Sequence, residues 1–332
     1  MRTILAAVVM LGLLAGCAQQ DKSTEGSASE TEQHGLHKMP VVLDTDIGTD
    51  IDDTWALALL LNSPRLDLQL VVTDSGNTRE RARIAAKYLD EAGRGDVPVA
   101  IGRSFDENPL PQSPWAGDYQ LGSHRGKVYE NGVTALVDAI MNSPEPVVLI
   151  VIGPASNIAD ALRQEPAIAQ KARVVAMSGS VDVGYGDKPQ PDAEYNVKTD
   201  PAATRAMYAA GWDVLLAPLD TCGTIQLKGG LYQRVHTSSK PSLLALMENY
   251  RTWSTRENWT KVDPAVESST LFDTLAVALV VDQSWVDVEE LKLEVTGDGY
   301  TRRSPQGSSV RAALRWKDLN AYQQWLVDSL TR

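Results

Sequence analysis

Cysteine and positive charge are both scarce in this chain. Two of the 332 residues are cysteines, Cys17 and Cys222. Lysine and arginine number 31 against 43 aspartates and glutamates, and the net charge of −12 argues against a nucleic-acid partner. A content of 43% hydrophobic and 22% charged residues is typical of a soluble globular protein with a sizeable core. The length suffices for one large α/β domain or two small ones, and no internal repeat or composition shift indicates a second domain.

The first 16 residues have the pattern of a signal peptide. Arg2 precedes an apolar run, Ile4 to Leu14, that is too short to span a membrane. The run ends in Leu14-Ala15-Gly16-Cys17, which resembles the bacterial lipobox and implies cleavage before Cys17 and lipid attachment to its sulfur. The alternative is an ordinary secretory signal with a chance cysteine. We expect a lipid-anchored, extracytoplasmic protein of the bacterial cell envelope, and Ala18 favours the outer membrane if the cell is Gram-negative.

A lipid on Cys17 would leave Cys222 as the single free cysteine of the mature protein, which then has no internal disulfide. A lone cysteine is more often a small core residue than a nucleophile. Residues 18–38 are polar, with almost no large apolar side chain, as is typical of a flexible tether. The expected organisation is therefore a signal peptide at 1–16, a tether at 17–38 and one folded domain at 39–332.

One stretch, Val41 to Leu61, places an acidic loop between a strand-like apolar run and a helix-like apolar run. The five carboxylates of the loop are Asp44, Asp46, Asp50, Asp52 and Asp53. A helix dipole can account for the two in the first helical turn, but not for all of them. Like charges this close repel unless a cation neutralises them, and oxygen ligands favour a hard cation, Ca²⁺ or Mg²⁺. A metal site is the preferred interpretation, and a solvated acidic loop is the alternative.

The chain after residue 41 alternates between apolar strand-like runs and helical patterns, which predicts a parallel sheet covered by helices on both faces. The pattern predicts strands at 41–44, 68–73, 97–101, 147–152, 174–177 and 214–217. It predicts helices at about 53–62, 78–92, 130–142, 155–164, 201–210, 241–256, 271–281 and 318–330. Residues 285–316 alternate apolar and polar side chains and predict a small antiparallel addition.

Polar residues follow several of the predicted strands, at the edge where such sheets bind ligands. Asn77, Asn157, Glu194 and Asn196 are the residues of this group. Each can simply satisfy the backbone of a turn, but as a set they would suit a polyhydroxylated ligand such as a sugar. Asp273, at the start of an apolar helix, is by itself best explained as an N-cap.

Four segments, in order, resemble the inosine-uridine preferring nucleoside hydrolase family. The stretch DTDIGTDIDDTWAL from Asp44 to Leu57 resembles the family's DTDxGxDDAxAL, with two residues added after the glycine. Gly153 to Ile158 resembles GPLTNIA. Ala193 to Asn196 resembles AEFN, with Asp200-Pro201 after it, and Phe272 to Val277 resembles HDxLAV. The resemblance runs from about Val41 to the C-terminus.

The resemblance implies an α/β fold with an open, mostly parallel sheet, and Ca²⁺-dependent hydrolysis of the N-glycosidic bond of ribonucleosides through an oxocarbenium-like transition state. It implies that Ca²⁺ is held by Asp46, Asp53, Asp273 and the backbone carbonyl of Ser156, with Asp46 also the general base. It implies that the ribose hydroxyls are bound by Asp52, Asn77, Glu194 and Asn196, and that Asp44 and Asp50 stand behind them. The added residues also allow Asp50 to replace Asp52 or Asp53. The family further suggests a homo-oligomer, a dimer or tetramer.

Phe272 departs from the family pattern, because many members have a histidine here that protonates the leaving base. Base departure then needs another donor or a base that leaves unaided. His124 and His236 are candidates for the donor by residue type. Aromatic residues that could stack on a base are Trp115, Tyr119, Tyr185, Trp253 and Trp259, although most such residues simply pack in the core.

Two other functions compete with the nucleoside hydrolase. A haloacid-dehalogenase-type phosphotransferase is suggested by Leu43 to Asp46, LDTD, but the second acidic pair that it needs is not found at a late strand end. A lipid-anchored nucleoside-binding protein without turnover is favoured by Phe272, whereas the retained carboxylates favour hydrolysis. We therefore expect an N-glycosyl hydrolase.

Overall fold

A computed structural model of the chain describes residues 37–256 and 260–332. These residues belong to one unit, His37–Arg332. The predicted signal peptide, Cys17 and nearly all of the predicted tether lie outside the described residues, as does Trp259. Within the described part, none of the helices combines the length and apolar character needed to cross a membrane.

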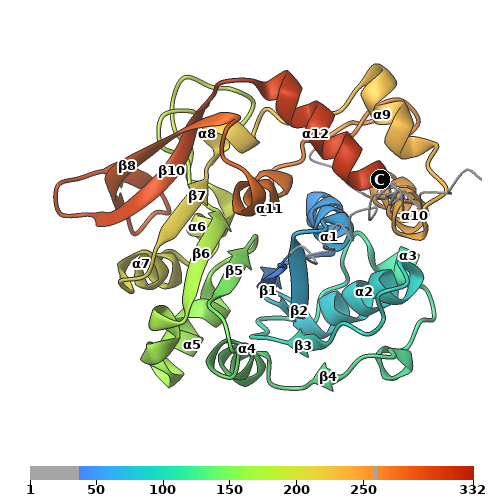
Figure 1. Ribbon diagram of the computed structural model, residues 1–332, viewed down its shortest axis with the longest axis horizontal. Coiled ribbons are helices and arrows are strands. Elements are labelled where there is room, and N and C mark those ends of the chain that lie inside the picture. Colours follow the sequence, from blue (N-terminus) through green and yellow to red (C-terminus); the bar gives the residue numbers. More distant parts are fainter. Residues whose placement is uncertain (1–36, 257–259) are drawn as a thin grey trace, which may run out of the picture. The chain divides into compact units, whose positions relative to one another are not determined.

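A ten-stranded, mostly parallel sheet runs through the described unit (Figure 1), which confirms the predicted fold class. Its order is β4-β3-β2-β1-β5-β6-β7-β10-β8-β9. The parallel strands are β1 (Met39–Thr45), β2 (Leu66–Thr73), β3 (Val99–Ile101), β4 (Val128–Tyr129), β5 (Val147–Val151), β6 (Ala172–Met177) and β7 (Val214–Ala217). The central strands β5 and β7 are entirely buried apolar runs, and β1 has such a run at residues 41–43, as expected for strands covered on both faces.

The last three strands form the predicted antiparallel addition. They are β8 (Val286–Val295), β9 (Thr301–Arg303) and β10 (Ser308–Trp316). β10 continues the sheet by pairing parallel to β7, and β8 then pairs antiparallel to both β10 and β9.

Helices cover both faces of the sheet. One face is covered by α1 (Asp52–Asn62), α2 (Thr78–Glu91), α3 (Ser113–Ala116), α9 (Gly229–His236), α10 (Pro241–Ser254), α11 (Thr274–Val281) and α12 (Leu319–Thr331) (Figure 1). The other face is covered by α4 (Gly132–Met141), α5 (Ser156–Gln164) and α7 (Pro201–Ala209). Short helical segments in loops are η1 (Leu121–Ser123), η2 (Pro166–Gln170), α6 (Tyr195–Thr199) and α8 (Leu219–Cys222). Each face has its own apolar core, one on either side of the strands.

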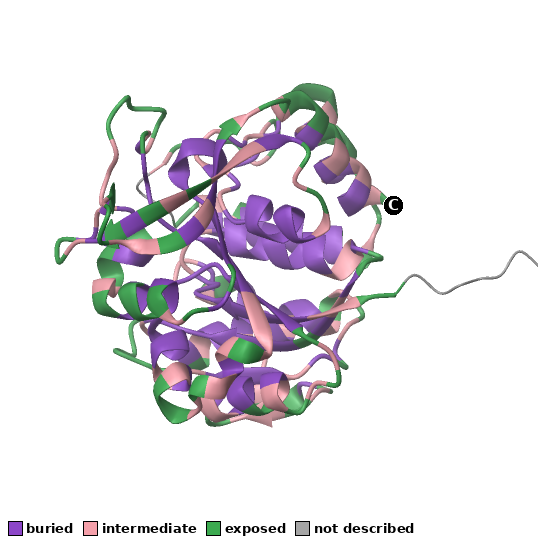
Figure 2. Ribbon diagram, turned by 60° about the vertical axis from the view of Figure 1, so that its left-hand side comes forward, coloured by how far each residue is buried: buried purple, intermediate pink, exposed green. Residues whose placement is uncertain are grey.

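Two helices on the first face are buried over almost their whole length. Every residue from Asp52 to Leu60 in α1 and from Thr274 to Val280 in α11 is buried. α1 packs against α10, α11 and α12 besides the sheet, so no side of it faces solvent. Figure 2 shows this buried interior in purple, with exposed green residues on the outer helices. Because both helices are enclosed, their sequences are apolar throughout, except at the N-terminal ends that meet beside the sheet edge.

The predicted strands and helices are all present, mostly within two or three residues of the expected bounds. The elements that were not predicted are short or weakly patterned. β4 has two residues, and α9 begins with Gly229 and Gly230, which are poor helix formers. Their formation depends on tertiary packing, such as that of α9 against α12.

Burial of α11 predicts a large effect of truncating one of its side chains. Leu275→Ala should lower the free energy of unfolding by about 2–5 kcal/mol, because it leaves a cavity in a fully buried helix. Leu244→Ala, at a position 55% exposed in α10, is the matched control and should change it by less than about 0.5 kcal/mol. Urea denaturation followed by circular dichroism measures both. Equal effects of the two substitutions would contradict the described packing.

Candidate functional site

The strand order of the sheet reverses at β1, which makes it a topological switch point. The chain adds β2, β3 and β4 on one side of β1 and later adds β5, β6 and β7 on the other. The loops that leave β1 and β5 diverge at this point, which opens a crevice at the carboxyl edge of the sheet. The acidic loop follows β1, and the Gly153 loop follows β5, so both border the crevice.

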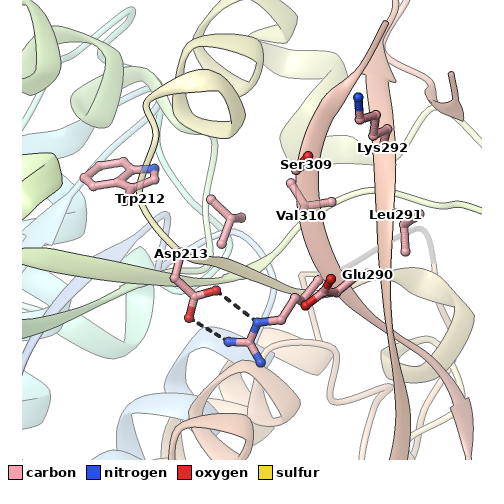
Figure 3. A pocket seen from close by; sticks show the side chains of 9 residues that line it. Trp212, Asp213, Glu290, Leu291, Lys292, Ser309 and Val310 are labelled. Atoms are coloured by element: carbon pink, nitrogen blue, oxygen red, sulfur yellow. Dashed lines mark hydrogen bonds and ion pairs between the residues drawn. The ribbon is translucent and has the colours of Figure 1, made fainter. Parts of the chain in front are cut away.

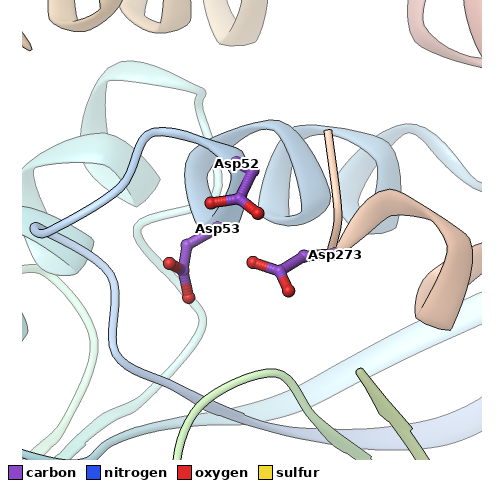
Figure 4. Close-up of side chains that lie close together, drawn as sticks. All are labelled: Asp52, Asp53 and Asp273. Atoms are coloured by element: carbon purple, nitrogen blue, oxygen red, sulfur yellow. The ribbon is translucent and has the colours of Figure 1, made fainter. Parts of the chain in front are cut away.

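Three carboxylates from two helix N-termini point toward one another at this edge (Figure 4). Asp52 and Asp53 lie in the first turn of α1, and Asp273 immediately precedes α11. One oxygen from each lies within 4.8 Å of the others. Asp273 occupies the N-cap position, but its side chain makes no capping hydrogen bond. The simple N-cap explanation therefore does not account for its side chain, which faces the other carboxylates instead.

A cavity of about 340 Å³ opens beside these carboxylates. Six of its lining residues carry a carboxyl group: Asp46, Asp50, Asp52, Asp53, Glu194 and Asp273. Its other lining residues are Thr49, Ile152, Met177, Tyr185, Tyr195, Asn196 and Phe272. The lining thus combines carboxylates with apolar and aromatic side chains, which is the composition expected of a site for a ligand with a polar and a planar part.

Burial and mutual repulsion shift the acidity of the carboxylates. Burial raises the pKa of Asp52, Asp53 and Asp273 well above the usual range, and the neighbouring negative charges raise each of them further. The pKa of Asp46 is also raised by burial, although Arg81 opposes the shift. Such a cluster is unstable as a set of bare anions, and its all-oxygen donors suit a hard divalent cation. The residues present therefore fit a metal ion.

Glu194 and Asn196 are held in the cavity wall by backbone groups. The Glu194 carboxylate accepts hydrogen bonds from the N–H groups of Gly179, Asn196 and Val197 at 3.0, 2.7 and 3.2 Å. Burial nevertheless raises the pKa of Glu194 to about 7. The Asn196 amide donates to the carbonyls of Ile152 and Met177, each at 3.1 Å. Both side chains are therefore fixed in orientation.

Asp44 and Asp50 differ in their burial and in their access to the cavity. Asp44 is fully buried beneath the cavity and accepts a hydrogen bond of 2.8 Å from the Asn157 amide. Asp50 lines the cavity itself, is partly exposed, and accepts a hydrogen bond from the N–H of Ile51 at 2.6 Å. The structure thus places Asp44 behind the site and Asp50 at its wall, whereas the sequence left the place of Asp50 open.

Two predicted site residues are not brought to the cavity. Ser156, whose backbone carbonyl was the predicted ligand, is not among the residues that line the cavity, whereas Ile152 is, and the Ser156 hydroxyl donates to Asp200 at 2.8 Å. The Asn77 side chain accepts from the N–H of Glu80 and donates to the carbonyl of Asn108, each at 3.1 Å. It therefore caps α2, the structural role that turn residues often have.

Two charged residues near the site were not predicted from the sequence. Arg81 is 2% exposed and donates hydrogen bonds to the carbonyls of Asp46, Ile47 and Ser75, which ties α2 to the acidic loop. Asp74 is fully buried next to Asp44, and burial together with the charge of Asp44 raises its pKa well above the usual range. Asp74 follows a strand and Arg81 lies within a helix, and no motif in the sequence identifies either of them as a site residue.

The histidines proposed as proton donors lie elsewhere. His124 is buried, with its ring Nε2 at 2.9 Å from the Val97 carbonyl and Nδ1 at 3.4 Å from Asp90. His236 packs against Tyr232 in α9. Of the described aromatic residues considered for stacking, Tyr185 lines the cavity, whereas Trp115, Tyr119 and Trp253 do not. Tyr185 packs edge-on against Phe272, with ring centroids 6.0 Å apart.

A second groove, of about 480 Å³, is larger but lies at the start of β7, away from the carboxyl edge. Figure 3 shows an ion pair in it between Asp213 and Arg311, with oxygen and nitrogen 2.7 Å apart. None of the predicted site residues lines this groove, and its charged groups neutralise each other. The acidic cavity is therefore the candidate site.

Comparison with known protein sequences identifies the same family that the four sequence motifs resemble. The profile of the family described as "Inosine-uridine preferring nucleoside hydrolase" matches residues 41–322. A non-specific ribonucleoside hydrolase, RihC, of Escherichia fergusonii is 30% identical over 322 residues, covering 89% of this chain and 99% of that protein. The RihC protein of Klebsiella pneumoniae is 32% identical over 229 residues, covering 65% and 74%.

Solved structures share the fold at lower identity. A plant nucleoside hydrolase has a TM-score of 0.75 at 21% identity, covering 88% of this chain and 99% of its own. The inosine-uridine preferring nucleoside hydrolase of Bacillus anthracis has a TM-score of 0.69 at 18% identity, with the same coverage of both chains.

The raised carboxyl pKa values predict how the stability of the cation-free protein depends on pH. The pKa of Asp44 is raised to about 6 and that of Glu194 to about 7, so the folded protein holds protons that the unfolded chain releases above about pH 4. In chelator, the melting temperature should therefore fall as the pH rises from about 4.5 to about 7. With a divalent cation present the fall should shrink or reverse, because the ion binds the ionised carboxylates. A melting temperature that rises over this range in chelator would contradict the assignment.

Proposed function

Because this chain belongs to the inosine-uridine preferring nucleoside hydrolase family and is a hydrolase of N-glycosyl compounds, we propose that it cleaves ribonucleosides into base and ribose with the help of a bound Ca²⁺ ion. The observation that carries the proposal is the convergence of Asp46, Asp52, Asp53 and Asp273 on one buried cavity. The ribonucleoside hydrolases among its relatives support the substrate class.

The donor set suits a hard ion held by Asp46, Asp53 and Asp273. One oxygen of Asp52 lies within 4.8 Å of oxygens of Asp53 and Asp273, so Asp52 can bind a sugar hydroxyl next to the ion. Ser156 does not line the cavity, and Ile152, four residues earlier, is the better source of a backbone carbonyl. When bound, Ca²⁺ would lower the pKa of water and fix the sugar hydroxyls.

The side chains of this site then have separable roles. Asp46 removes the proton of the attacking water, for which a raised pKa makes it a better base. Asp52, Glu194 and Asn196 accept hydrogen bonds from the ribose hydroxyls and hold the ring against the nucleophile. Their negative charge also stabilises the positive charge that develops on the ribosyl ring. Asp44 and the Asn157 amide hold the acidic loop in place from below.

A nucleoside-binding protein without turnover is the second candidate function. It is favoured by Phe272, and by the absence of histidine among the described residues that line the cavity. Binding alone, however, gives no reason to bury several carboxylates beside one another. The phosphotransferase alternative is set aside, because the hydrolase family profile spans nearly the whole described domain.

We also propose that the protein is anchored to the extracytoplasmic face of the bacterial envelope through a lipid on Cys17. The support is the sequence Leu14-Ala15-Gly16-Cys17 after an apolar run. Cys17→Ser should move the protein from the membrane fraction to the soluble fraction, as measured by fractionation and metabolic lipid labelling. Lipid labelling that persists in Cys17→Ser would contradict the anchor.

Asp46→Asn tests the proposed chemistry. The substitution keeps the size of the side chain but removes its basicity, and should lower ribose release from ribonucleosides by about 100- to 10,000-fold. Reducing-sugar release by the soluble domain, with Ca²⁺ and with chelator, measures the effect. Asp118→Asn, the same change at an exposed position outside the cavity, is the control and should leave the rate unchanged. Full nucleoside binding without any sugar release by the unsubstituted protein would favour the binding function instead.

A further inference from the structure

Three aromatic residues are among those that line the acidic cavity. Phe272 and Tyr185 pack edge to face, with an interplanar angle of 81°. The N–H of Tyr195 donates to the Tyr185 hydroxyl at 2.9 Å, which links the third aromatic residue to this pair. Tyr195 is 48% exposed and Tyr185 is partly buried, so the group runs from the interior to the mouth. This aromatic group, Tyr185, Tyr195 and Phe272, lies in the same cavity as the residues proposed to hold the sugar.

The described lining residues offer poor proton donors to a departing base. They include no histidine, lysine, arginine or cysteine. The Glu194 carboxylate accepts from three backbone N–H groups, which favours its ionised form, and the proposed function uses its remaining acceptor capacity for the ribose hydroxyls. Burial raises the pKa of both Tyr185 and Tyr195, and the neighbouring carboxylates raise it further, so both hydroxyls are weaker acids than a free phenol. A neutral base, which must gain a proton to leave as a stable molecule, is therefore not assisted by these residues.

The carboxyl groups that line the cavity outnumber the charges that one divalent ion can balance. Six carboxyl groups line it, and a divalent cation balances two negative charges. Arg81, the positive side chain beneath the site, donates to backbone carbonyls and does not line the cavity. A positively charged ligand is favoured by the carboxylates and by the faces of aromatic rings. The lack of a proton donor and the excess of carboxyl groups therefore both favour a base that carries a positive charge.

We propose that this site acts preferentially on N-ribosides whose base already carries a positive charge, that is, N-alkylated purinium or pyridinium ribosides. The inference rests on the hydrolase function proposed above. In the reaction the bond between C1′ and the ring nitrogen breaks, and its electron pair neutralises the cationic ring. The water oxygen bonds to C1′ and gives its proton to Asp46, so the products are neutral base, ribose and one proton. The leaving group needs no proton, so the reaction does not depend on protonation of the base, the step for which the cavity offers no good donor.

The matched substrates N7-methylguanosine and guanosine differ by a methyl group and one positive charge. The kcat/KM of the Ca²⁺-loaded protein should be at least about 100-fold higher for N7-methylguanosine, the low end of what a general acid contributes. Para-nitrophenyl ribofuranoside reports on the sugar half of the site, because its leaving group departs without protonation, and it should also be hydrolysed.

Two substitutions of Phe272 separate the missing acid from the aromatic group. Phe272→His supplies a proton donor and should raise kcat for guanosine by at least about 10-fold, while kcat for N7-methylguanosine changes little. Phe272→Leu keeps the apolar volume but removes the ring, and should raise the KM for N7-methylguanosine by about 2- to 10-fold with little change for para-nitrophenyl ribofuranoside.

The outcomes distinguish this inference from the proposed function. Similar kcat/KM values for guanosine and N7-methylguanosine would overturn the inference and leave the hydrolase intact. Hydrolysis of para-nitrophenyl ribofuranoside, but of neither guanosine nor N7-methylguanosine, would also overturn it. Failure to hydrolyse para-nitrophenyl ribofuranoside, together with all ribonucleosides, would instead remove the proposed function on which it rests.

Discussion

Repulsion between buried carboxylates is the constraint on which the rest of this structure depends. Asp52, Asp53 and Asp273 are each at most 4% exposed, and their oxygens lie within 4.8 Å of one another. Burial of unpaired charge is strongly unfavourable, so the arrangement needs both a cation and fixed positive dipoles. The N-termini of α1 and α11 supply the dipoles. Both helices are enclosed over most of their length, which explains why their sequences are mainly apolar beyond the first turn.

A layer of hydrogen bonds keeps the acidic loop in place around this centre. Arg81 binds the carbonyls of the loop from α2, and Asn157 binds Asp44 from α5. Asn196 links the ends of β5 and β6 through the carbonyls of Ile152 and Met177. These contacts fix side-chain directions without neutralising the carboxylates, as the proposed binding of an ion and a sugar requires. The cluster is thus locally destabilising at the point where the proposed chemistry needs negative charge.

The sequence was sufficient for the architecture and for part of the site. Alternating apolar runs predicted the parallel sheet because central strands such as β5 are buried on both faces. Short elements such as β4 were missed, since two residues carry no periodic signal. For the site, residue types identified the acidic cluster but not the directions of side chains. The side chain of Asn77, for example, caps α2, and the residue type suits either that role or sugar binding, so the sequence alone does not decide between them.

The measurement that tests the central claim most directly is a Ca²⁺ titration of chelator-treated protein, with binding heat and ribose release recorded on the same preparation. Para-nitrophenyl ribofuranoside is the substrate of choice, because its release does not depend on the nature of the base. The account predicts one ion per chain, with binding and activity saturating at the same Ca²⁺ concentration, and loss of both in Asp53→Asn. Activity that is unchanged in chelator, or Ca²⁺ binding that survives in Asp53→Asn, would contradict the claim that the buried carboxylates form the functional metal site.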